Sequence, residues 1–259
     1  MKNKTIKNLM VISLVLITSM VFCDQKGEEI ASKHFALKES NDSYSMMKMT
    51  LIDKNNGTKI RSFESYSMKT NEGKNTFFRF LEPSDIRDTK FLTIGHKDKD
   101  DEQRIYLPSL KKVRLIASSS GSSGKSGEFV NSDIFFYDLE DRSYEDYTYK
   151  YVSEDTLDGK ECYVVEFFPI SKTSPYSRLT AWIDKSTYVL SKFVAYDLKD
   201  ELLKNILFKE NVLIDGVFVT KRLEIENVQK NHRTVLEASR IKINTGLDKS
   251  IFSIQNLSR

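Results

Sequence analysis

Apolar and polar residues alternate along most of the chain, as in strands that bury one face. In "SYSMMKMTLID", Met47, Met49 and Leu51 fall on one face, and the polar residues Lys48 and Thr50 fall on the other. Similar alternation occurs in "TFFRFL", "RIYLP", "ECYVVEFFP" and "GVFVTKRLEIENV". Turn signals, "NNG" and two "DG" pairs, separate these runs. The pattern predicts a meander of antiparallel strands with one apolar and one solvated face.

Helical patterns are few. Residues 28–38 place their apolar side chains on one helical stripe, and residues 84–88 and 248–252 favour short helical pieces. Residues 197–210, "DLKDELLKNILFKE", have helical propensity, but the regular succession of strands and turns on either side of them favours strands. We therefore predict a mainly β protein whose sheet covers its apolar face with little helix.

The first 23 residues have the pattern of a secretory signal. Three lysines precede an apolar run at residues 9–22, which is short for a membrane span. Two processing routes are open: ordinary cleavage after Cys23, or lipidation of Cys23 as the first residue of a lipoprotein. On either route the chain is exported. The predicted organisation is a signal peptide at residues 1–23 and a single domain at residues 24–259.

Removing the signal changes the charge balance. The chain has 40 Lys and Arg against 37 Asp and Glu, and the three signal lysines account for the excess. A domain without net charge does not fit a nucleic-acid binder, which needs a basic face. Cys162 is the only cysteine besides Cys23, so no disulfide is expected within the domain.

Gly124-Lys125-Ser126, within "SSGSSGKSGE", has the ending of a phosphate-binding loop. That motif needs glycine at the position of Ser119 and a helix directly after the loop. The glycine comes late, at Gly121, and the residues that follow are aromatic and strand-like. We therefore predict a flexible Gly/Ser loop between two strands and no nucleotide site.

The sequence has no recognisable catalytic or metal-binding pattern. His34, His96 and His232 lack the spacing of a metal site, and His34 and His232 are expected on the surface. No G-x-S-x-G nucleophile motif occurs. The acidic run at residues 98–102 lacks the glycine of a calcium loop and is expected to be a solvated hairpin tip. We predict a non-enzymatic protein with no metal and no other cofactor.

Aromatic residues and methionines are abundant, with 16 Phe, 12 Tyr and 7 Met. They either fill an ordinary core or line an apolar cavity under a curved sheet that has little helix to cover it. Flexible methionines and broad rings suit lipid chains, but composition leaves both interpretations open.

The order of many short segments resembles the outer-membrane lipoprotein-sorting proteins, the LolA-like group. The resemblance covers residues 27–257, and the segments include "FFRFLEPSDIRDTKFLTI", "YLPSLKKVR", "NSDIFFYDL" and "DGKECYVVEFFP". It implies a mainly β (α+β) fold: an unclosed, strongly curved antiparallel β half-barrel. In this fold an N-terminal helix and short helices cover the apolar concave face.

The resemblance also implies a function. In the family the hollow shelters acyl chains of lipoproteins, or another lipid, during transit across the periplasm of a two-membrane bacterium. An acyl chain in water costs about 0.8 kcal/mol per methylene, so a carrier needs an apolar wall and a movable lid. The Gly/Ser loop at residues 118–127 is a candidate for that lid or for a docking loop. The expected partners are acyl chains or another lipid and an RND-type or ABC-type envelope transporter, and a monomer is expected.

Strand parity and the resemblance together predict the residues that line the hollow. Phe78 and Phe80, for example, alternate with Arg79. A register error of one residue would turn each predicted side chain to the opposite face. The predicted lipid-binding residues are Met47, Met49, Phe78, Phe80, Ile105, Phe135, Tyr163, Val165 and Phe167. Neither Arg79 nor another position clearly matches the arginine that holds the lid in the family.

Two functions are compatible with these patterns. The first is a non-enzymatic periplasmic carrier or acceptor of lipid or lipoprotein acyl chains in outer-membrane lipoprotein sorting, anchored to a membrane if Cys23 is lipidated. The alternative is an accessory interaction module that docks on an RND-type envelope transporter without carrying a lipid. The two differ in their interior: a carrier needs an apolar cavity, whereas a docking module has a filled core.

Overall fold

The computed structural model describes residues 24–97, 99–117, 119 and 124–258. The predicted signal peptide and Cys23 lie outside these residues. The strands are β1 (Asp42–Ile52), β2 (Thr58–Lys69), β3 (Lys74–Glu82), β4 (Lys90–Ile94), β5 (Glu102–Leu107), β6 (Lys112–Leu115), β7 (Tyr147–Leu157), β8 (Lys160–Pro169), β9 (Arg178–Asp184), β10 (Leu190–Tyr196), β11 (Leu202–Ile214), β12 (Val217–Asn227) and β13 (His232–Ile243). The helices are α1 (Gln25–Phe35) and α2 (Ile254–Leu257), and the 3-10 helices are η1 (Pro108–Leu110), η2 (Phe129–Asn131), η3 (Phe136–Leu139), η4 (Tyr144–Asp146) and η5 (Lys249–Phe252).

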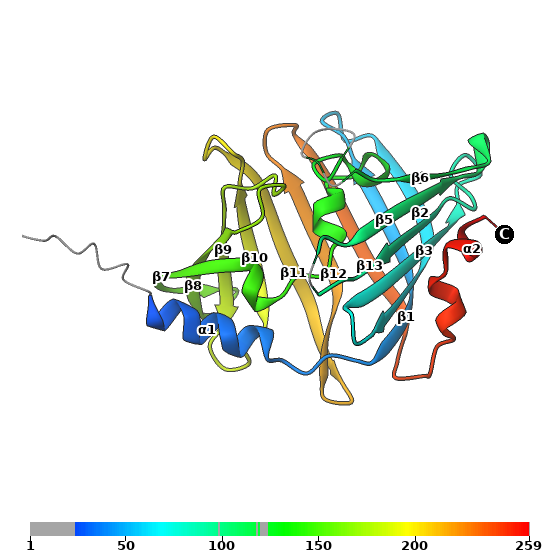
Figure 1. Ribbon diagram of the computed structural model, residues 1–259. Helices are drawn as coiled ribbons and strands as arrows, with labels where there is room; N and C mark the ends of the chain where they lie inside the picture. Colours follow the sequence, from blue (N-terminus) through cyan, green and yellow to red (C-terminus); the bar gives the residue numbers. More distant parts are fainter. Residues whose placement is uncertain (1–23, 98, 118, 120–123, 259) are drawn as a thin grey trace, which may run out of the picture.

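In the described part of the chain, 13 strands form one antiparallel sheet in the order β6-β5-β4-β3-β2-β1-β13-β12-β11-β10-β9-β8-β7 (Figure 1). The two edge strands, β6 and β7, do not pair with each other within the described residues. The sheet is strongly curved, and residues 124–146 run across its concave side (Figure 1). The predicted fold, a mainly β, unclosed half-barrel, is confirmed.

The local predictions hold at most hairpins. Both residues of each predicted Asp-Gly turn have positive φ. The values are 50° at Asp158 and 78° at Gly159, and 49° at Asp215 and 80° at Gly216. A two-residue hairpin turn that matches the twist of the sheet requires this conformation. Residues 197–210 form a turn and then part of β11, so the strand interpretation is confirmed. Residues 84–88 form turns and not the predicted helical piece.

The N-terminal helix, α1, packs against β7 and β8. It begins earlier than predicted, at Gln25, because the side chain of Asp24 accepts a hydrogen bond from the backbone N–H of Gly27 at 3.1 Å. The other carboxylate oxygen of Asp24 accepts from the backbone N–H of Tyr151 on β7 at 2.5 Å. One side chain therefore caps the helix and joins it to an edge strand of the sheet.

Apolar side chains form three clusters, two on the concave face and one on the convex face. The first concave cluster lies on β1 to β5 around Phe80 and Phe91, and the second lies on β7 to β11 around Phe167. On the convex face, Phe77 and Leu92 pack under η5 and α2. The prediction of a fully solvated second face is therefore wrong for this part of the convex side, because the C-terminal segment covers it (Figure 1).

Candidate functional site

The concave side of the sheet is covered by residues 124–146, called here the crossing segment, which contain η2, η3 and η4 (Figure 1). Phe129 of this segment is buried in the first concave cluster, with its ring centroid 5.0 Å from that of Phe91 and 5.8 Å from that of Phe78. Tyr137 belongs to the second concave cluster. The crossing segment thus packs its aromatic side chains into the hollow and links its two halves.

Polar contacts from the strands hold the crossing segment in place. Arg61 on β2 donates a hydrogen bond to the backbone oxygen of Val130, which has the left-handed conformation (φ 47°, ψ 44°) that a β-branched residue rarely adopts. Asp133 accepts from the hydroxyl of Thr234 on β13 at 2.7 Å, and its backbone N–H donates back to that hydroxyl at 2.9 Å. These contacts offset the strain at Val130 and fix the segment to β2 and β13.

A buried lysine forms a further link between the crossing segment and the sheet. Lys204 on β11 is fully buried, and its Nζ lies 2.8 Å from the hydroxyl of Tyr176 and 3.2 Å from a carboxylate oxygen of Asp138. The same Nζ lies 3.3 Å from the ring centroid of Phe135. Burial lowers the pKa of Lys204 and raises that of Tyr176 well above its usual range. The link joins η3 to β11.

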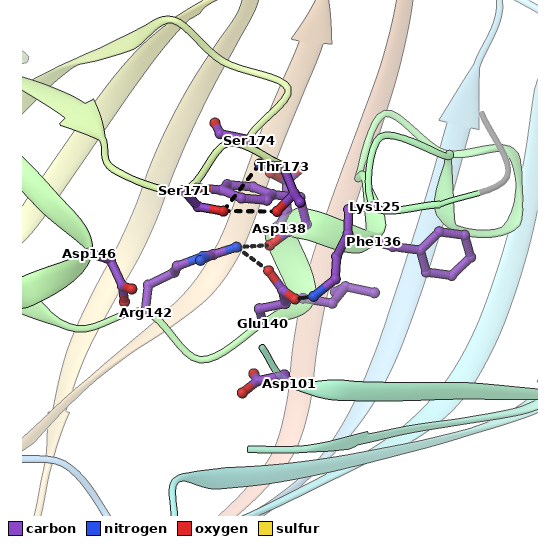
Figure 2. Close-up of polar contacts among 12 residues, drawn as sticks. Asp101, Lys125, Phe136, Asp138, Glu140, Arg142, Asp146, Ser171, Thr173 and Ser174 are labelled. Atoms are coloured by element: carbon purple, nitrogen blue, oxygen red, sulfur yellow. Dashed lines mark hydrogen bonds and ion pairs between the residues drawn. The ribbon is translucent and has the colours of Figure 1, made fainter. Parts of the chain in front are cut away.

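Lys125, the lysine of the loop that resembles a phosphate-binding motif, is also buried. Figure 2 shows Glu140 between Lys125 and Arg142, with ion pairs to both. The side chain of Lys125 is 1% exposed, and burial lowers its pKa. The described end of the predicted flexible loop is therefore fixed inside the protein, and it leads into η2 and not into a strand. Residues 118 and 120–123 of the predicted lid or docking loop lie outside the described residues.

Two further surface predictions need correction. Asp101, in the acidic run, is buried, and its carboxylate accepts hydrogen bonds from the backbone N–H groups of His96 at 3.0 Å and Asp141 at 2.8 Å. His34 is half-buried, with Nδ1 2.9 Å from the backbone oxygen of Tyr188. Burial raises the pKa of Asp101 and lowers that of His34. Neither side chain behaves as a freely solvated group.

Several cavities adjoin the crossing segment, and two of them have apolar side chains in their walls. The inner cavity, of about 320 Å³, has walls formed mainly by aromatic and aliphatic side chains. The outer cavity, of about 540 Å³, has apolar, hydroxyl and charged side chains in its wall. His34, Phe35, Arg142 and Phe208 line both cavities, so the two adjoin. Inner-cavity side chains from the sheet include Phe167, Leu179, Phe193, Ile206, Phe208 and Leu223.

The structure brings the nine predicted lipid-binding residues onto the concave side of the sheet. Met47, Met49, Phe78, Phe80 and Ile105 belong to the first concave cluster, and Phe135, Tyr163, Val165 and Phe167 belong to the second. Of the nine, Phe167 lines the inner cavity and Met47 lines the outer cavity. Met49, Phe80 and Val165 are fully buried in these clusters. Lipid binding by the nine residues remains a prediction.

Sequence reasoning missed several residues around the cavities. Ile206 and Phe208 alternate on β11, so the strand pattern of "NILFKE" contained a signal for them once the strand interpretation was chosen. Lys204 shares their parity, but no local pattern distinguishes a buried lysine from a solvated one. Arg142 lies in a segment without regular alternation, and nothing in its neighbours indicates a position between two cavities.

None of the helices in the described ranges is long and apolar enough to cross a membrane. Within the same ranges, no group of three or more His, Cys, Asp or Glu side chains could hold a metal ion.

Comparisons with known proteins agree with this architecture. A family model described only as that of an uncharacterized protein matches residues 72–259. No curated protein matches the chain. The chain is similar to the solved structure of an outer membrane lipoprotein-sorting protein domain from Vibrio parahaemolyticus, with 30% identity and a TM-score of 0.86 over 91% of this chain and 100% of that chain.

Two other solved structures are also similar. A DUF1329 family protein from Desulfovibrio piger ATCC 29098 is 28% identical, with a TM-score of 0.85 over 91% of this chain and 99% of that chain. The LolA superfamily protein NE2245 from Nitrosomonas europaea is 18% identical, with a TM-score of 0.69 over 89% of this chain and 98% of that chain. At that identity the last similarity concerns the fold alone.

Proposed function

The chain belongs to the outer membrane lipoprotein-sorting protein family, the LolA-like group, and from this premise we propose that it is a non-enzymatic periplasmic carrier or acceptor of lipid or lipoprotein acyl chains. The observation that supports this function most directly is the inner cavity of about 320 Å³ on the concave side of the sheet. Pockets for small-molecule ligands, which are lined mostly by apolar side chains, have volumes of about 300 to 1,000 Å³.

The wall of the inner cavity suits an acyl chain. Phe167, Phe193 and Phe208 supply aromatic surface, and Ile206 and Leu223 supply aliphatic surface. Each methylene that leaves water for such a wall gains about 0.8 kcal/mol. The outer cavity adjoins the inner one and is the entrance that we propose. This cavity does not favour the alternative of a packed docking module.

The sequence adds a route of export and a partner to this function. Residues 1–23 serve as a signal peptide, residues 24–259 form a single domain in the periplasm, and Cys23 is either removed or lipidated. Acyl chains reach or leave the domain through an RND-type or ABC-type envelope transporter.

Filling the inner cavity tests the proposal. In the variant Ile206→Trp, the indole occupies space in the cavity, so we expect a loss of affinity for a fluorescent fatty acid of about tenfold or more, equivalent to about 1.4 kcal/mol. The matched control is Leu207→Trp, on the same strand with its side chain on the opposite face of the sheet, and it should bind like the wild type. Circular dichroism checks that both variants fold.

Native mass spectrometry of the protein purified gently from its own envelope gives an independent test. A co-purifying lipid or acylated peptide is the expected result, and the same spectrum shows whether Cys23 carries diacylglycerol. A wild-type protein that carries no lipid and takes up no fatty acid would contradict the proposed function.

A further inference from the structure

The outer cavity contains more basic than acidic side chains. Lys38, Lys74 and Arg142 line it, and of its described lining residues only Glu39 is acidic. The carboxylate of Glu39 already pairs with Lys69, at 3.1 Å. The side chains that line the outer cavity therefore include more cations than carboxylates, although Glu140 pairs with Arg142 and Asp141 lies beside Lys74.

Arg142 lies where the two cavities adjoin. Its guanidinium stacks on the ring of Tyr137, at 3.7 Å from the ring centroid, and pairs with Glu140. Glu140 also pairs with Lys125, and the carboxylates of Asp100 and Asp101 act on the same lysine (Figure 2). The Nε of Arg142 is buried and has no hydrogen-bond partner within the described residues. A buried donor of this kind usually has a partner, and a ligand is one source of it.

Hydroxyl groups add to the polar character of the outer cavity. Ser40, Ser43, Ser45 and Ser67 line it, and the hydroxyls of Ser43 and Ser67 lie 2.9 Å apart. Hydroxyls and cations both donate hydrogen bonds to anionic oxygens, and bonds to an ionised acceptor are stronger than neutral ones. The two cavities thus change from apolar on the inside to hydrogen-bond donating and basic on the outside.

We infer that the ligand is an amphiphile with a negatively charged head group, whose acyl chain lies in the inner cavity and whose head group lies in the outer cavity beside Lys38, Lys74 and Arg142. This inference rests on the proposed function. The chemistry that the site selects is an anionic oxygen group, a carboxylate or a phosphate. A carboxylate would come from a fatty acid, and a phosphate from a phospholipid.

The test compares amphiphiles that share one chain and differ in the head group. Dodecanoate, dodecyl phosphate and dodecyltrimethylammonium are titrated into the full domain by calorimetry, below the concentrations at which they form micelles. We expect the better of the two anions to bind at least about tenfold more tightly than the cation, because hydrogen bonds to an ionised acceptor are stronger than neutral ones. Tighter binding of dodecanoate indicates a fatty acid, and tighter binding of dodecyl phosphate indicates a phospholipid.

Variants locate the charge preference in the outer cavity. The double variant Lys38→Glu/Lys74→Glu should remove the preference for anions, and Lys38→Gln/Lys74→Gln should reduce it if the glutamates impair folding. The matched control, Lys48→Glu/Lys209→Glu, changes the net charge equally at lysines that form ion pairs with Glu237 and Glu224 outside both cavities. It should keep the preference.

The outcomes separate this inference from the proposed function. If all three amphiphiles bind equally well, the inference is wrong and the carrier function stands. If none binds, the proposed function fails, and the inference fails with it. A preference for anions that the control variant removes as effectively as the cavity variants would also overturn the inference.

Discussion

Lys204 illustrates at the residue scale how the interior accommodates charge. A buried ammonium loses its hydration, and that loss is offset only when partners satisfy its donors. Here Asp138 supplies a carboxylate, Tyr176 supplies a hydroxyl oxygen, and the ring of Phe135 supplies its negative face. Asp138 and Phe135 belong to the crossing segment, so this lysine stabilises the cover of the hollow and not only its own strand.

Replacing this lysine should therefore be costly. We expect Lys204→Met to lower the free energy of unfolding by about 3 kcal/mol, because Asp138 and Tyr176 lose their shared partner. The control Lys209→Met, on the same strand, removes a half-exposed pair with Glu224 and should cost less than about 1 kcal/mol. Urea unfolding followed by circular dichroism measures both. Similar losses of unfolding free energy in the two variants would show that the buried contacts of Lys204 stabilise the protein no more than a half-exposed ion pair does.

At the scale of elements, α1 is positioned by close backbone contact with β7. A Cβ placed on Gly27 would lie 2.7 Å from the backbone nitrogen of Tyr151, closer than real Cβ contacts allow. Asp24 spans the same junction, with hydrogen bonds to both backbones. The absence of a side chain at Gly27 is what lets the helix lie directly on the edge strand.

Gly27→Ala tests this contact against helix propensity. Propensity alone predicts a gain of about 1 kcal/mol, because alanine is the better helix former. We expect the opposite, a loss of about 1 to 3 kcal/mol, because the methyl group forces α1 away from β7. Ser32→Ala, at an exposed position of the same helix, is the control and should change stability by less than about 0.5 kcal/mol. Thermal unfolding distinguishes the two, and a more stable Gly27→Ala variant would refute the close contact.

At the scale of the whole molecule, the curved sheet is covered on both faces by segments that are not strands. The crossing segment covers the concave side, and η5 with α2 covers Phe77 and Leu92 on the convex side. Leu257 of α2 is fully buried, whereas Ile254 of the same helix is 43% exposed. The C-terminal segment therefore contributes to the core of the domain.

Substitutions in α2 measure that contribution. Leu257→Ala should lower the free energy of unfolding by about 2 to 5 kcal/mol, since it leaves a cavity above Phe77 and Leu92. Ile254→Ala should have an effect below about 0.5 kcal/mol. Chemical unfolding of the two variants provides the comparison, and equal effects would mean that the C-terminal segment does not cover the convex face in solution.

The sequence by itself determined the strands, most of the turns and the faces of many side chains. Phe78 and Phe80 face the concave cluster while Arg79 lies outside and pairs with Asp88 at 2.8 Å, as their alternation predicted. Alternation is reliable because successive side chains of a strand must point to opposite faces, whatever the rest of the chain does. The family resemblance, spread over many short segments, then predicted the unclosed half-barrel.

Only the tertiary structure decided which apolar positions are filled and which leave space. Phe80 and Phe167 both lie at apolar positions of alternating strand sequences. In the structure, however, Phe80 packs beneath Phe129 of the crossing segment, whereas Phe167 lines the inner cavity. Likewise, Lys125 and Lys204 look like surface lysines until Glu140 and Asp138 come beside them. Alternation is a property of neighbouring residues, whereas cavities and buried charges depend on segments that are distant in the chain and meet only in the folded protein.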